Sequence, residues 1–106
     1  MQGCVVVSNK FATEKTEHLE VFLSEYKASI EYVNANQAEA ASMIVALEIL
    51  ALPAPVAEAA INGSKIAYID GDSMRASLVK LYEVLYDADP TSIGGKKPDE
   101  NIFYKK

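Results

Sequence analysis

The chain holds few side chains whose chemistry could support catalysis or metal binding. His18 is its one histidine and Cys4 its one cysteine. Acid–base or nucleophilic catalysis by either residue needs a partner group within hydrogen-bond reach, and no spacing in the sequence supplies one. A zinc site needs three or four such ligands at set spacings. We therefore expect His18 to be a solvated surface residue and Cys4 a small buried apolar residue, with no catalytic residue, metal site or cofactor.

Two short patterns partly match ligand-binding loops. The triplet Asp70-Gly71-Asp72 begins like a calcium loop but lacks the remaining oxygen ligands and the closing glutamate. The run Gly94-Gly95-Lys96-Lys97 lacks the full spacing of a phosphate-binding loop. We interpret the first as a turn with a helix cap and the second as part of an irregular tail.

The charge balance restricts the partners. The chain has 10 basic and 15 acidic residues, for a formal net charge of −5. An acidic surface repels the nucleic-acid backbone, and no polybasic run is present that would favour an anionic membrane. No stretch reaches the roughly 18 apolar residues of a membrane span. We expect neither nucleic acid nor a lipid surface as a partner.

Hydrophobic periodicity predicts a mainly α chain of about four helices and one N-terminal strand. The predicted helices cover residues 16–35, 37 to about 50, 55–61, and about 72 or 73 to 87. Asn36 is the predicted N-cap of the second helix. The end of that helix is apolar nearly all round, so we expect it to be deeply buried: Met43, Ile44, Val45, Leu47, Ile49 and Leu50. Residues 91–106 are predicted to be an irregular tail, and we see no boundary that would divide residues 1–106 into more than one domain.

The predicted strand covers the short β-branched run Cys4-Val5-Val6-Val7. A lone buried strand has unpaired backbone donors and acceptors on both edges, and each orphaned group is costly. The sequence contains no second convincing strand to pair with it. Either this strand pairs with another copy in an oligomer, or the chain belongs to a larger protein.

Several segments resemble, in their order and spacing, the C-terminal part of extracytoplasmic solute-binding proteins of ABC importers. These are residues 5–12, 19–29 and 32–41. The subgroup serves nitrate, sulfonate, taurine and thiamine-precursor importers, and residues 63–71 and 90–104 resemble a clostridial branch of it. Thr16 and Gln37 stand where those proteins commonly have proline, so two frequent helix-start residues are missing.

The resemblance implies a fold and a function. Members have an α/β two-lobed fold of the type II periplasmic binding proteins, in which this chain would be the return segment that completes lobe one. They are not enzymes: they capture a small-molecule solute and deliver it to an ABC permease. It also implies an extracytoplasmic lipoprotein whose export signal and anchoring cysteine lie upstream of Met1, because Cys4 follows no apolar signal region.

The resemblance also places one site. Gln2 and Gly3 would lie where the chain enters the strand through the hinge between the lobes, beside the ligand cleft, and glycine permits backbone torsions there that other residues resist. A plain strand start explains these residues equally well.

Two other functions remain open at this point. One alternative is a complete, stand-alone helical protein-interaction domain, in which an oligomer would share the strand. A weaker alternative is a fragment of a thiamine-pyrimidine synthase, an enzyme class that shares the binding-protein fold; its chemistry needs a poised histidine, for which His18 is poorly placed. As an isolated piece the chain is expected to form a homodimer or a strand-exchanged oligomer.

Overall fold

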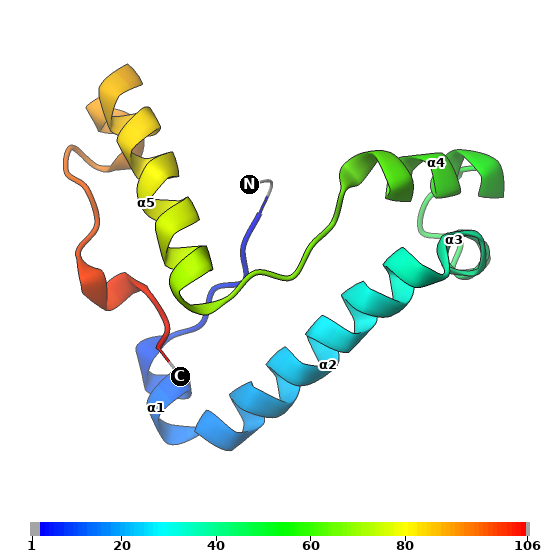
Figure 1. The fold of residues 1–106 in the computed structure, drawn as a ribbon, viewed down its shortest axis with the longest axis horizontal. Coiled ribbons are helices and arrows are strands. Elements are labelled where there is room, and N and C mark those ends of the chain that lie inside the picture. The colour runs from blue at the N-terminus through cyan, green and yellow to red at the C-terminus, as the bar shows by residue number, and fades with distance from the viewer. Residues whose placement is uncertain (1–2, 106) are drawn as a thin grey trace. The chain divides into compact units, whose positions relative to one another are not determined.

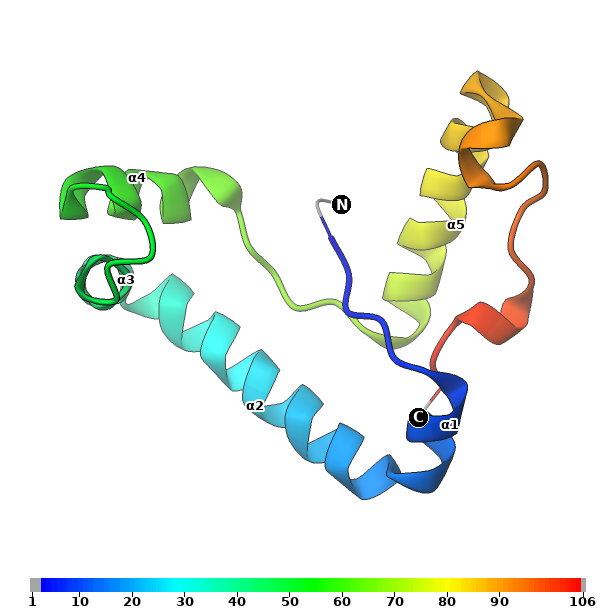
Figure 2. The ribbon, with the colours of Figure 1, turned by 180° about the vertical axis from the view of Figure 1, so that it is seen from behind.

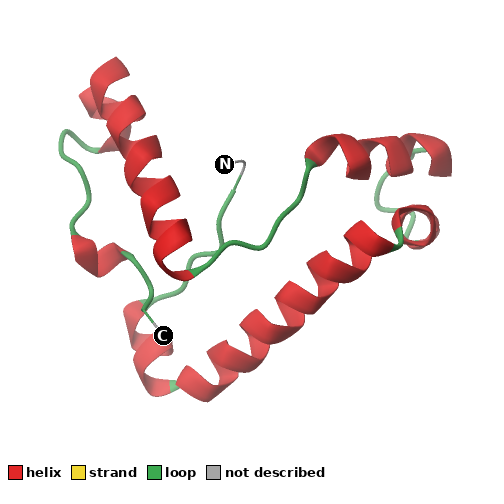
Figure 3. Ribbon diagram, in the orientation of Figure 1, coloured by secondary structure: helices red, strands yellow, loops and turns green. Residues whose placement is uncertain are grey.

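The structure is a computed structural model that describes residues 3–105. Within that range the chain is mainly helical and contains no strand, as Figure 3 shows. The elements follow in the order α1 (Asn9–Glu14), α2 (Thr16–Ala35), α3 (Gln37–Ala46), α4 (Ala54–Ser64), α5 (Gly71–Ala88), and the short 3₁₀ helices η1 (Pro90–Ile93) and η2 (Glu100–Ile102) (Figure 1). The prediction of a mainly α chain is confirmed.

The elements form two compact units. The α1–α4 unit comprises Val7–Tyr68, and the α5 unit comprises Ile69–Lys106 together with Met1–Val6. Each unit is described below by itself. The expectation that residues 1–106 act as one domain stays a prediction.

Helix α2 begins and ends where the sequence predicts. Its apolar periodicity buries Leu19 and Ile30. At its end the backbone N–H of Asn36 donates to the Tyr32 carbonyl oxygen, and the Asn36 side chain donates to the same oxygen at 3.0 Å. Asn36 does occupy the position before α3, but its side chain makes no capping bond to that helix. It therefore closes α2 instead of capping α3.

The core of the α1–α4 unit lies between α3 and α4, which contact each other; in both views α3 is seen end-on next to α4 (Figure 1, Figure 2). It consists of small residues and one isoleucine: Ala40, Ala41, Ala57 and Ile61. Alanine has no side chain beyond Cβ, so the two helix backbones approach closely. Val33 of α2 and Ile44 and Val45 of α3 pack against this core.

The end of the second helix differs from the prediction. Helix α3 ends at Ala46, and Glu48 adopts a left-handed backbone with φ of 53°. Ile44 and Val45 are half-buried, but the other four apolar residues expected to be buried are exposed: Met43, Leu47, Ile49 and Leu50. The all-round apolar pattern was wrongly interpreted as deep burial, because it gives no indication of how many faces find a neighbour.

The predicted strand at residues 4–7 is wrong for this structure. Val5, Val6 and Val7 are exposed, and no strand pairing forms among the described residues. β-branched residues favour an extended backbone, but a strand also needs a second backbone for its hydrogen bonds. Helix α1 follows these residues and was not predicted from the sequence. Its N-cap is Ser8, whose side-chain oxygen accepts a hydrogen bond from the Phe11 N–H at 3.2 Å.

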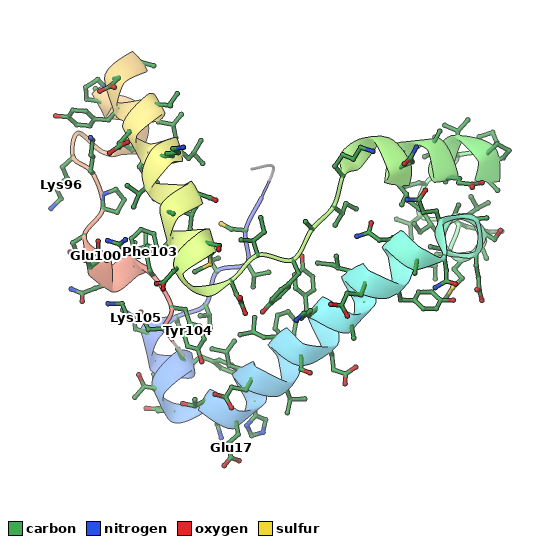
Figure 4. The ribbon with its side chains drawn as sticks, viewed as in Figure 1. Glu17, Lys96, Glu100, Phe103, Tyr104 and Lys105 are labelled. Atoms are coloured by element: carbon green, nitrogen blue, oxygen red, sulfur yellow. The ribbon has the colours of Figure 1, made fainter. Side chains whose placement is uncertain are left out.

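In the α5 unit the tail packs back on α5. The helix begins at Gly71, one or two residues before the predicted start. Phe103 is buried, and it lies with Glu100 beside the N-terminal half of α5 (Figure 4). Gly94 and Gly95, which close η1, have φ of 80° and 81°, a region that glycine enters without strain. The tail is irregular as expected, yet it is tied to the helix.

Candidate functional site

The structure places only one of the two predicted hinge residues. Gln2 lies outside the described residues. Gly3 is exposed and lies outside regular structure, and a Cβ atom added there would meet nothing within 4 Å. A ligand-binding or hinge role for Gln2 and Gly3 stays a prediction.

The two chemically reactive residues are both on the surface. Cys4 is exposed, which corrects the expectation of a buried filler; the expectation depended on a strand that does not form here. His18 is exposed in the first turn of α2, beside a shallow hollow lined by residues 13–18. All six lining residues are consecutive and span the end of α1 and the first turn of α2, so no segment distant in the sequence contributes a wall or a catalytic partner. In the part of the chain that is described, no cluster of three or more histidine, cysteine or carboxylate residues could hold a metal ion.

The strongest side-chain interaction joins α5 to the tail. Arg75 donates two hydrogen bonds to the two carboxylate oxygens of Glu100, one of them from Nε to Oε2 at 2.7 Å. The Arg75 guanidinium also lies 5.9 Å from the centre of the Phe103 ring. The pKa of Glu100 is lowered, first by the hydrogen bonds from Arg75, and the pKa of Arg75 is raised by the same pair. These three residues, the Arg75 clamp, fix the tail; both charges are already satisfied within the clamp, so it offers no open site.

An exposed aromatic row lies on α2. Phe22 and Tyr26 stack at 5.7 Å between ring centres, and Tyr26 meets Tyr68 edge-on at 6.2 Å. Asn34 donates to the Ile66 carbonyl oxygen at 2.8 Å and so holds the segment after α4 against α2. Tyr26 is 40% exposed. Its apolar helix face is only partly covered within the described chain.

A second exposed surface lies on α3 and the turn behind it. Glu39, Met43 and Leu47 follow one another at a spacing of four residues and form one row on the helix surface. Tyr32 of α2 lies next to this row and shares a hydrogen bond with the Glu39 carboxylate. That hydrogen bond raises the pKa of the Tyr32 phenol. Ile49 and Leu50 extend the surface into the turn. We call these six residues the α3 face: Tyr32, Glu39, Met43, Leu47, Ile49 and Leu50.

The sequence contains a signal that the α3 face is exposed, although its apolar residues favour burial. The segment is strongly apolar, yet it is interrupted by Glu48 and bordered by Glu39, and charged residues are rarely buried without a partner. Those two glutamates favour an outer surface. The structure therefore offers a binding surface as the candidate site, built on α2, α3 and the following turn.

Comparison with known proteins adds no assignment. No family model, curated protein or solved structure matches this chain. None of the helices described here combines the length and the apolar character needed to cross a membrane.

Proposed function

We propose that this chain is part of the solute-binding component of an ABC importer. In this proposal it forms the return segment of lobe one in an α/β, two-lobed protein of the type II periplasmic-binding-protein fold. The solute would be a small molecule such as a sulfonate, nitrate or a thiamine precursor. The protein would act outside the cytoplasm, anchored as a lipoprotein, and would hand its solute to a permease.

One observation carries the proposal alongside the sequence resemblance. Residues 4–7 are apolar and β-branched, yet Val5, Val6 and Val7 are exposed and pair with no strand among the described residues. Exposed β-branched backbone of this kind is what a neighbouring strand pairs with. A sheet in the rest of lobe one would supply that neighbour, and the valines would then be buried in it.

The mechanism would be binding without bond chemistry. The solute is held between two lobes, and closure about the hinge completes its contacts before delivery. In this chain Gln2 and Gly3 would lie at the hinge, and the helices would pack on lobe one. Most contacts to the solute would come from residues outside this chain.

The test compares the 106-residue chain with the protein encoded when its reading frame is followed upstream of Met1. We expect the amide hydrogens of Val5, Val6 and Val7 to exchange rapidly in the chain and to be protected in the longer protein. Calorimetry against sulfonates, nitrate and pyrimidine thiamine precursors should detect binding only by the longer protein. Micromolar binding by the chain alone, or rapid exchange at the valines in both proteins, would refute the proposal.

The exposed α3 face favours a second candidate, a stand-alone helical interaction protein. Leu47 is 66% exposed and Ile49 is 77% exposed, which is unusual for large apolar side chains unless a partner covers them. Gene context separates the two candidates. A ribosome-binding site directly before Met1 supports the interaction protein, and continuous coding sequence there supports the importer component.

A further inference from the structure

The α3 face lies in the middle of a long segment without positive charge. Between Lys27 and Lys65 there is no lysine or arginine, while Glu31, Glu39, Glu48 and Glu58 all occur there. Each of these four glutamates is exposed. The surface of α3, α4 and the turn between them is therefore purely acidic wherever it is charged.

The apolar part of the α3 face does not serve the core. The side of α3 that packs on α4 is formed by Ala40 and Ala41, which are 4% and 1% exposed. Met43 and Leu47, three and seven residues after Ala40, border that side but are 56% and 66% exposed. Glu39 begins their row, and Glu48 stands directly behind it. The α3 face thus combines an apolar row with Glu39 at its start, and the exposed Glu48 follows Leu47 in the chain, before Ile49 and Leu50.

We infer that the α3 face docks a second protein whose contact surface is apolar and bordered by lysine or arginine. Burial of Met43 and Leu47 would supply the non-directional attraction, and the two carboxylates would select a basic border and fix the register. Exposed leucine and methionine beside carboxylates that form no ion pair among the described residues would match a partner surface that is apolar at its centre and basic at its border.

Charge disfavours the competing occupants. A second copy that met the α3 face through its own α3 face would bring the same glutamates, without any cation from this segment, against the first copy's glutamates, and like charges are disfavoured at an interface. An anionic lipid surface and a nucleic acid are repelled for the same reason. The inference does not rest on the proposed importer function, because it uses only the composition and exposure of this segment.

The test uses two designed helical peptides with the 106-residue chain. Both carry the same leucine stripe; one is flanked by lysines and the other by glutamates. Fluorescence anisotropy should show that the lysine peptide binds at least about tenfold more tightly than the glutamate peptide, with an affinity that falls as salt rises. Equal binding of the two peptides would overturn the inference, because the acidic border would then have no selective effect.

Matched variants locate the binding. The double variant Met43→Ser/Leu47→Ser should abolish binding of the lysine peptide, and Glu39→Gln/Glu48→Gln should remove most of its advantage over the glutamate peptide. Val84→Ser, on α5 at a residue 65% exposed, is the control and should bind as the unmodified chain does. All five positions are exposed, so their side chains can change without opening a core.

Two further outcomes would overturn the inference. Binding that persists in Met43→Ser/Leu47→Ser would place the peptide elsewhere. Sedimentation that shows self-association of the unmodified chain, lost in the same double variant, would identify a second copy as the occupant. Helix content measured for each variant confirms that a loss of binding is not a loss of fold.

Discussion

Arg75 of α5 contacts two residues of the tail. Its guanidinium binds both oxygens of Glu100 and lies over Phe103, the buried residue of the tail. A lysine could supply the charge but not the planar fork that binds a carboxylate through two nitrogens. The clamp therefore depends on the identity of this residue as well as on its charge.

The clamp gives a prediction for Glu100. Its pKa is lowered below 4.5 by Arg75, so the pair contributes its stability above that pH and loses it as the pH falls through the lowered value. In Arg75→Gln we expect the pKa of Glu100 to return toward 4.5, as measured by an NMR titration of its carboxyl carbon. Asp89 is the internal control: its pKa is lowered by hydrogen bonds from Thr91 and should not change. An unchanged pKa of Glu100 in the variant would contradict the clamp.

Glu48 gives a prediction about backbone strain. It follows the C-cap of α3 with φ of 53°, a position where glycine is usual and a β-carbon is unfavourable. Replacement by glycine should stabilise the chain by up to about 1 kcal/mol, since relief of strain is partly offset by the greater freedom of glycine in the unfolded chain. Urea denaturation measures this. The control is Glu58→Gly, inside α4, where the same change should destabilise the chain by about 0.5–1 kcal/mol. A loss of stability in both variants would contradict backbone strain at Glu48.

At the scale of the element, the contact of α3 with α4 depends on small residues. Ala41 is 1% exposed and faces Ala57 and Ile61 in the same cluster. A leucine at position 41 would force the two helices apart, at a cost of about 1–3 kcal/mol. Ala38→Leu places the same side chain on an exposed position of the same helix and should cost little. Thermal unfolding followed by circular dichroism compares the two, and equal midpoints would contradict this packing.

The elements also show what local sequence can predict. Helix α2 was predicted correctly from Thr16 to Ala35, because twenty residues of clear periodicity end at an asparagine that closes the helix. The end of α3 was placed too late, because the residue that breaks it is a glutamate in a glycine-type conformation. α1 was missed because the capping Ser8 directly follows a run of valines and was interpreted as the end of a strand.

At the scale of the whole molecule, non-local information was missing. Whether Val5, Val6 and Val7 form a strand depends on a second backbone, which no pattern within those residues specifies. The same limit applies to the candidate site. The composition of the α3 face was visible in the sequence, but its exposure depends on α4 packing against the alanines and leaving Met43 and Leu47 uncovered.

The exposed valines predict how the isolated chain associates. An exposed segment of β-branched residues can pair with the same segment of another copy, whereas two α3 faces that met would bring like charges together, so we expect a dimer to form through residues 4–7. In sedimentation velocity at rising concentration we expect a dimer that Val6→Pro abolishes, because proline removes a backbone donor, and that Val6→Thr preserves, because threonine is also β-branched. A chain that stays monomeric at high concentration, or a proline variant that dimerises as well as the threonine variant, would show that this segment does not act as a strand.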